Sequence, residues 1–192
     1  MTKIYLIRHG KTAFNEAVQK KLYGLSFNVN DILDISLSND GIKEIESKYN
    51  ELRGGKIDVV FSSTLKRSIQ TANILSDIID CHKIITDKRL NEINYGSFEG
   101  KIFDENDYLN GKMRTMKNPL DIRFPNGESF NDVYNRINSF ISDIKIKHKE
   151  KNILIITHKT VIKMFLFYFK YDSEKNIILD KYKNELIFKF TL

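Results

Sequence analysis

Short apolar runs recur along the chain, separated by longer segments in which apolar residues return every three or four positions. The short runs are rich in Ile, Leu, Val and Phe and do not alternate with polar residues, which is typical of strands buried on both faces. They predict strands at residues 3–7, 57–61, 83–86, 152–157 and 185–190.

The longer segments have the period of amphipathic helices. The clearest stripe spans residues 130–144 and begins just after Ser129, a residue type that caps helix N-termini. Weaker stripes cover residues 65–79 and 42–52. Residues 161–169 are apolar on nearly every side, which indicates a helix covered by other elements.

Strands that alternate with helices predict an α/β fold, a three-layer αβα sandwich around a mostly parallel sheet. A chain of 192 residues is long enough for one such core, so we expect a single domain over residues 1–192. Two stretches, 15–38 and 96–127, do not fit the pattern. We expect long loops or short helices there, around a site.

Several classes of protein are excluded by composition. No apolar run approaches the ~18 to 20 residues of a membrane span, and residues 4–7 are too short for the core of a signal peptide. The single cysteine, Cys81, cannot form an internal disulfide or a cysteine zinc site. We therefore expect a protein of the reducing cytoplasm.

The formal net charge is +6, but lysines are interleaved with acidic residues along the whole chain. The densest basic stretch, 145–151, closes a predicted helix, where cations interact favourably with the helix dipole. We therefore expect no nucleic-acid partner. The charge is compatible with a small anionic substrate, and it leaves the oligomeric state open.

Polar residues with catalytic chemistry follow the predicted strands. Arg8 and His9 follow the first strand, Arg67 lies a turn into the helix after the second, Glu92 follows the third and His158 follows the fourth. Each of them alone would fit an ordinary structural or surface role. Ligands of open α/β sheets bind at the carboxyl ends of the strands, so together these residues indicate an anion site. The other histidines fall in polar segments, where we expect solvated side chains: His82 and His148.

These residue types suit phosphoryl transfer. A neutral imidazole such as His9 can attack phosphorus and form a phosphohistidine. Arg8 and Arg67 can bind phosphoryl oxygens through guanidinium forks, and His158, when protonated, adds a donor. Glu92 can protonate the leaving alkoxide and then deprotonate the attacking water. No spacing typical of metal ligands appears, so we expect neither metal nor cofactor.

Five ordered segments resemble motifs of the histidine phosphatase superfamily, also called the phosphoglycerate mutase-like family. They are LIRHGKTAFN at 6–15, SSTLKRSIQTA at 62–72, LNE at 90–92 followed by YGSFEG at 95–100, PNGES at 125–129 and IITH at 155–158. By this resemblance His9 is the phosphorylated nucleophile, Arg67 and His158 belong to the phosphate pocket, and Glu92 is the proton donor.

The resemblance carries further expectations. It implies that Asn15 and Gly24 contact phosphate, that Tyr95 lies in a substrate-binding segment, and that the sheet has one antiparallel strand, which we assign to the carboxyl-terminal one. Members of this size include α-ribazole phosphatases and broad-specificity phosphatases. The expected substrate is thus a small phosphomonoester, with α-ribazole phosphate as a candidate.

The sequence departs from the family pattern at two places beside the motifs. Lys159 and Thr160 follow the last histidine, where members commonly have a small residue; we expect Lys159 to face solvent. Lys11 stands where relatives often have an acidic residue, so we expect a more positive pocket.

Two other functions stay open. A 2,3-bisphosphoglycerate-dependent phosphoglycerate mutase would have an adjacent arginine pair, which this sequence lacks, although Arg114, Lys117 and Arg123 could serve instead. A catalytically silent protein could use the same pocket to hold a phosphorylated ligand. Five side chains could wall the pocket or belong to the core: Phe27, Ile32, Tyr108, Met113 and Met116.

Overall fold

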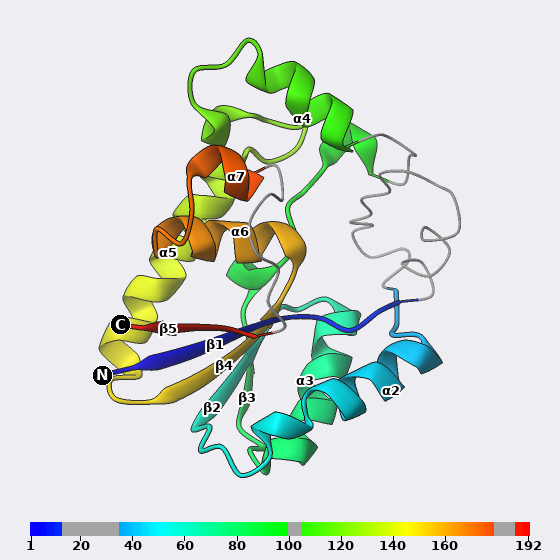
Figure 1. Cartoon of the computed structure of the whole chain (residues 1–192), viewed down its shortest axis with the longest axis vertical. Coiled ribbons are helices and arrows are strands. Elements are labelled where there is room, and N and C mark those ends of the chain that lie inside the picture. Colours follow the sequence, from blue (N-terminus) through cyan, green and yellow to red (C-terminus); the bar gives the residue numbers. More distant parts are fainter. Residues whose placement is uncertain (13–34, 100–104, 179–186) are drawn as a thin grey trace.

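The computed structural model describes residues 1–12, 35–99, 105–178 and 187–192. Within these residues, one sheet has the strand order β3-β2-β4-β1-β5 (Figure 1). Its strands are β1 (Lys3–Arg8), β2 (Val59–Ser62), β3 (Ile84–Thr86), β4 (Asn152–Thr157) and β5 (Phe188–Thr191). Strand β5 runs antiparallel to β1, and the other neighbours are parallel. The predicted mostly parallel sheet with an antiparallel carboxyl-terminal strand is therefore confirmed.

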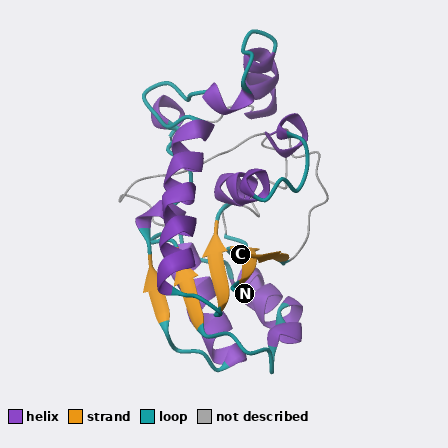
Figure 2. Cartoon of the chain, turned by 90° about the vertical axis from the view of Figure 1, so that its left-hand side faces the viewer, coloured by secondary structure: helices purple, strands orange, loops and turns teal. Residues whose placement is uncertain are grey.

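Helices cover both faces of the sheet (Figures 1 and 2). Helices α2 (Asn39–Lys48) and α3 (Lys66–Ile79) cover one face, and α5 (Phe130–Lys147) and α6 (Lys159–Tyr168) cover the other. Smaller helices complete the described chain: α4 (Glu105–Met113), α7 (Glu174–Ile178) and the 3-10 turns η1 (Asn50–Leu52), η2 (Lys88–Leu90), η3 (Gly96–Phe98) and η4 (Pro119–Asp121). The predicted αβα sandwich is confirmed.

The two helical layers have separate apolar cores because neighbouring strand residues point to opposite faces of the sheet. In β1, Ile4 and Leu6 pack with the α5 and α6 layer, whereas Ile7 packs with α2 and α3. All three side chains are fully buried. Burying each contributes about 1.5–3 kcal/mol, which explains why continuous apolar runs form these strands.

Helix boundaries follow the expected capping signals. The Ser129 side chain accepts a hydrogen bond from the Asp132 backbone N–H, and the Asp132 carboxylate accepts one from Ser129 in return. This capping box begins α5 where the sequence predicts. Lys145 and Lys147 lie in the last turn of α5, near the negative end of its dipole.

The irregular stretch 96–127 contains the short helices η3, α4 and η4, one of the two forms expected from the sequence. Tyr108, Met113 and Met116 pack against the apolar core on the α5 and α6 side of the sheet. This favours a role in the core over a role in the wall of the pocket. Phe27 and Ile32, like most of the stretch 15–38, lie outside the described residues.

Two motif segments pack backbone against backbone. Gly96 has a φ of +56°, and a Cβ atom on it would lie 2.2 Å from the Pro125 carbonyl oxygen. A Cβ atom on Gly127 would lie 2.3 Å from the Asn94 carbonyl oxygen. The Ser97 N–H donates to that Pro125 oxygen at 2.7 Å, so the contact is hydrogen-bonded as well as close. Only glycine permits this approach, and it fixes the segment after Glu92 on the start of α5.

The expectation of solvated histidines holds for His82, whose side chain is 68% exposed. It is wrong for His148, which is half-buried with its ring edge-on to Phe61 at 5.2 Å. The histidine follows the last residue of α5, and its ring packs on Phe61 of β2 instead of continuing the solvated lysine face. In the described part of the chain, we find no helix long and apolar enough to cross a membrane.

Replacing Gly96 with alanine should destabilise the fold through both backbone strain and collision. Gly54 is the matched control, because its φ is also positive, at +79°, while no atom lies within 4 Å of its added Cβ. We expect Gly96→Ala to lower the free energy of unfolding by at least about 2 kcal/mol more than Gly54→Ala, as measured by urea denaturation. Equal losses in the two variants would contradict the close packing of Gly96.

Candidate active site

The site forms where β1, β2 and β4 end side by side. The His9 N–H donates to the Thr157 carbonyl oxygen at 2.9 Å, and the Ser63 N–H donates to Ile156 at 3.1 Å. These bonds extend the pairing of β4 with β1 and β2 beyond the strand ends. They bring His9, Ser63 and His158 to one point on the carboxyl edge of the sheet.

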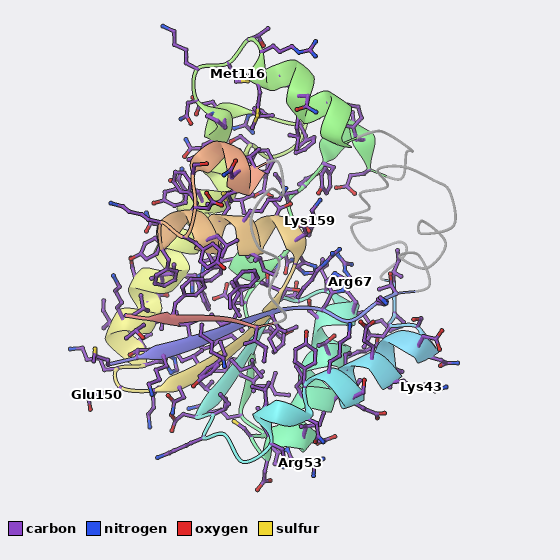
Figure 3. All side chains as sticks on the ribbon, in the orientation of Figure 1. Lys43, Arg53, Arg67, Met116, Glu150 and Lys159 are labelled. Carbon is purple, nitrogen blue, oxygen red and sulfur yellow. The ribbon has the colours of Figure 1, made fainter. Side chains whose placement is uncertain are left out.

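Arg67 connects the two histidines. Its Nε atom lies 3.2 Å from His9 Nε2, and its Nη2 atom lies 3.3 Å from His158 Nδ1. The imidazole rings are 5.0 Å apart. Arg67 is the second residue of α3, and Figure 3 shows it at the carboxyl edge of the sheet. One guanidinium group thus donates to both imidazoles.

The hydrogen bonds of His9 define its tautomer. Its Nδ1 atom lies 2.8 Å from the Gly10 carbonyl oxygen, which can only accept, so Nδ1 carries the proton. Its Nε2 atom faces the guanidinium of Arg67, which can only donate. The Nε2 lone pair therefore points toward Arg67. In this orientation a nitrogen that can attack an electrophile lies beside a cation.

The hydrogen bonds of His158 place its proton on the opposite nitrogen. Nδ1 accepts from Arg67, so Nε2 donates to the Ser63 hydroxyl at 2.7 Å. The Ser68 hydroxyl lies 3.3 Å from the same Nε2 atom. His158 is fully buried and Arg67 is 8% exposed, so this part of the site has little contact with water.

Both histidines are neutral at pH 7 without a ligand. Burial, followed by the charges of Arg8 and Arg67, holds the pKa of His9 well below its usual value. Burial and then Arg67 lower the pKa of His158 in the same way. A protonated His158, as considered from the sequence, therefore requires an anion in the site to offset these cations.

Glu92 lies beside the start of α6. Its Oε1 atom accepts from the Ile93 N–H at 2.9 Å and from the Thr160 N–H at 3.2 Å. Its neighbour Asn91 accepts from the Thr64 N–H at 2.9 Å, in the loop between β2 and α3. These bonds join the Glu92 loop to the loops that carry Ser63 and His158.

The other residues expected at the site have different outcomes. Arg8 is exposed at the end of β1, and its charge acts on both histidines. Asn15 and Gly24 lie outside the described residues. Tyr95 is 2% exposed and its ring packs edge-on to Phe124 at 4.7 Å, so it belongs to the apolar core on the α5 and α6 side of the sheet, and its role in substrate binding stays a prediction.

The structure also shows the surroundings of Lys11 and Lys159, which stand at the two departures from the family pattern. Lys11 forms an ion pair with Glu44 of α2 at 3.1 Å, which offsets the additional positive charge expected in the pocket. Lys159 is the first residue of α6 and is half-buried, not fully in solvent (Figure 3).

Sequence reasoning named Thr71, Ser68 and Asn91 only as members of motif segments and Thr160 only as a departure from the family pattern, and it gave none of them a role. Thr71 and Ser68 were detectable, since the first lies one helical turn after Arg67 and the second is adjacent to it. Asn91 and Thr160 contact the site through loop geometry that no periodicity signals. Within the described residues, no group of three or more His, Cys, Asp or Glu side chains could hold a metal ion.

Comparisons with known proteins agree with this geometry. The model of the histidine phosphatase superfamily, branch 1, matches residues 4–178. Phosphoserine phosphatase 1 of Hydrogenobacter thermophilus is 28% identical over 160 residues, which are 82% of this chain and 71% of that protein. Phosphoglycerate mutase-like protein 4 of Arabidopsis thaliana is 29% identical over 165 residues, 84% of this chain and 68% of that protein.

A solved structure has the same fold. The Bacillus stearothermophilus protein YhfR superposes with a TM-score of 0.70 at 27% identity, over 92% of this chain and 84% of that one.

The neutral histidines make stability depend on pH. In the unfolded chain His158 takes up a proton below its ordinary pKa of 6.5, whereas the folded protein resists protonation. Stability is therefore fully present above that value and falls as the pH decreases, by up to about 1.4 kcal/mol per pH unit for each such histidine. Urea denaturation at several pH values should show a shallower acid slope in His158→Gln than in wild type.

His82→Gln, at an exposed histidine, is the control for this series. Equal slopes of wild type and His158→Gln across the acid range would show that His158 is not held neutral in the folded protein.

Proposed function

The chain belongs to the histidine phosphatase superfamily, and on this premise we propose that it hydrolyses phosphomonoesters without a metal, through a phosphohistidine at His9. The observation that carries the proposal is the double hydrogen bond of Arg67 to the two imidazoles. It places the lone pair of a neutral, oriented histidine beside a cation that binds phosphoryl oxygens.

In the first step, Nε2 of His9 attacks phosphorus as the bond from phosphorus to the leaving oxygen breaks. Glu92, in its acid form, gives its proton to the leaving oxygen, which departs as an alcohol. Arg67 and Arg8 hold the phosphoryl oxygens, with His158 as a further donor once it is protonated. Each charge-assisted hydrogen bond contributes about 1.5–3 kcal/mol, so bonds that strengthen in the transition state account for much of the acceleration.

In the second step, water attacks the phosphorus of the phosphohistidine. Glu92, now a carboxylate, accepts a proton from that water while the bond between phosphorus and Nε2 breaks. Inorganic phosphate leaves, and both His9 and Glu92 return to their starting forms. Glu92 serves as the acid in the first step and as the base in the second, so this route requires no metal or cofactor.

The substrate in this proposal is a small phosphorylated metabolite. Relatives named as phosphoserine phosphatases support phosphoserine as a first candidate, and a structure titled α-ribazole phosphatase from Shigella flexneri, similar in fold, keeps α-ribazole phosphate as a second. The proposal includes no nucleic-acid or membrane partner. A reducing, cytoplasmic location belongs to it as well, because the one cysteine, Cys81, is a buried free thiol.

One of the three basic residues that could replace the arginine pair of a mutase has structural partners instead. This weakens the mutase alternative. Arg123 forms an ion pair with Asp132 at 2.7 Å and donates to the Gly127 carbonyl oxygen at 2.8 Å. These contacts use Arg123 at the start of α5 and do not aim it at a substrate carboxylate. The mutase-like relative still makes phosphoglycerate an essential member of any substrate panel.

Removing the nucleophile should abolish turnover. We expect His9→Ala to release phosphate at least about 10³-fold more slowly than wild type with p-nitrophenyl phosphate, phosphoserine, α-ribazole phosphate or 3-phosphoglycerate. The assay contains a chelator, and His82→Ala is the control variant. Turnover that survives in His9→Ala would contradict the mechanism. Interconversion of phosphoglycerates primed by 2,3-bisphosphoglycerate, without phosphate release, would instead identify a mutase.

The role of Glu92 predicts a dependence on the leaving group. Glu92→Gln keeps a polar side chain of the same length but cannot give up a proton. We expect it to slow phosphorylation of His9 by about 10²–10⁴-fold with an alkyl phosphate such as phosphoserine, and by much less with p-nitrophenyl phosphate. Rapid-quench measurement of phosphoenzyme formation compares the two. An equal loss with both substrates would show that Glu92 is not the acid.

A further inference from the structure

Thr71 lies behind the candidate nucleophile without touching it. It is fully buried in α3, one helical turn after Arg67. Its hydroxyl accepts a hydrogen bond from the Gly10 N–H at 3.0 Å and donates one to the Arg67 carbonyl oxygen at 2.8 Å. The hydroxyl therefore joins the loop after β1 to the first turn of α3.

Gly10 is held on both sides of its backbone. Its N–H binds Thr71, and its carbonyl oxygen accepts the proton of His9 Nδ1 at 2.8 Å. A Cβ atom on Gly10 would lie 2.4 Å from Ile45, so the glycine packs tightly against α2. Thr71 holds the His9–Gly10 peptide plane and Ile45 fills the space beside the Gly10 Cα atom, so the carbonyl oxygen in the next peptide plane has a defined direction.

We propose that Thr71 is a positioning residue for His9. Thr71 acts through Gly10 and thereby keeps the His9 proton on Nδ1 and the lone pair on Nε2. A neutral imidazole divides its proton between two nitrogens, and the partner of one nitrogen decides the tautomer. Without the Thr71 hydroxyl the His9–Gly10 peptide loses its buried partner, and the Gly10 residue that carries the carbonyl oxygen can turn. The carbonyl oxygen then no longer selects Nδ1.

The same hydroxyl sets the distance between His9 and Arg67. The guanidinium donates to Nε2 of His9, and the backbone carbonyl of Arg67 accepts from Thr71. Thr71 therefore coordinates the orientation of the ring with the place of the cation it faces. Small displacements of a reacting group cost about 10²-fold in rate, so this coordination has a measurable effect.

The test compares the wild-type chain with three variants of the full chain. Thr71→Val removes the hydroxyl with little change of shape, and Thr71→Ser keeps the hydroxyl and loses the methyl group. Ser76→Ala is the matched control, because Ser76 is a buried residue of the same helix whose hydroxyl bonds only the Asn73 carbonyl among the described contacts. Thermal unfolding and circular dichroism establish that each variant is folded.

The first measurement is the tautomer of His9, from ¹⁵N imidazole NMR with the signal assigned by its loss in His9→Ala. We expect protonated Nδ1 in wild type, Thr71→Ser and Ser76→Ala, and a mixture of tautomers in Thr71→Val. Protonated Nε2 in wild type would overturn the proposal at once, even if Thr71→Val did not fold. An unchanged tautomer in a folded Thr71→Val would overturn it equally.

The second measurement separates orientation from binding. We expect kcat to fall about 10- to 100-fold in Thr71→Val and to stay within about 3-fold in Thr71→Ser, while inhibition by inorganic phosphate changes less than about 3-fold in either. Equal losses of kcat in Thr71→Val and Ser76→Ala would indicate general destabilisation and contradict the proposal.

The kinetic arm rests on the proposed function, since it takes His9 as the nucleophile. The NMR arm does not, because it requires no substrate. An enzyme inactive on every phosphomonoester, with the expected tautomers, would refute the proposed function and leave the role of Thr71 standing.

Discussion

The guanidinium of Arg67, placed between two imidazoles, sets the chemistry of the whole site. Burial of the two rings, together with the charges of Arg67 and Arg8, keeps both rings neutral, so that each ring offers a lone pair to the Arg67 guanidinium instead of repelling it. A bond from a guanidinium to a neutral nitrogen is weaker than one to a phosphoryl oxygen, in which both partners are charged. A phosphoryl dianion therefore exchanges weaker partners of Arg67 for stronger ones. The same exchange releases Nε2 of His9 to face phosphorus.

The topology of the sheet makes this arrangement possible. Strand β4 lies between β1 and β2, so the histidines after β1 and β4 become neighbours and α3 starts beside both. The apolar cores on the two faces hold these strand ends in place. His9 and His158, separated by about 150 positions in sequence, thus meet at one edge of the sheet.

The sequence predicts the parts of this structure that depend on the burial of apolar runs. It does not predict which tertiary partner a single side chain takes. Continuous apolar runs and the Ser129 cap located β1, β4 and α5 because apolar burial and capping are strong local signals. Helix α4 has no apolar stripe, so periodicity could not define its bounds. Tyr95 lies in a motif segment, yet the packing of its ring against Phe124 is a tertiary contact. Lys11 pairs with Glu44, a partner 33 positions away that no sequence spacing reveals.

The close contact of Gly96 with Gly127 fastens the segment after Glu92 at a single point. The chain leaves this contact after Gly96 and returns to it at Pro125, and the described residues between them, 97–99 and 105–124, include α4 and η4. The buried side chains of this segment, Leu109, Leu120, Ile122 and Phe124, belong to the core and hold the segment in place. Its exposed turns are free of that constraint, so changes there cost little conformational entropy. New side chains at the exposed positions of α4, such as Asn110 and Lys112, can then change the surface of this helix while Glu92 keeps its position. The outer surface of this helix can therefore change in chemical character without renewed adjustment of the acid.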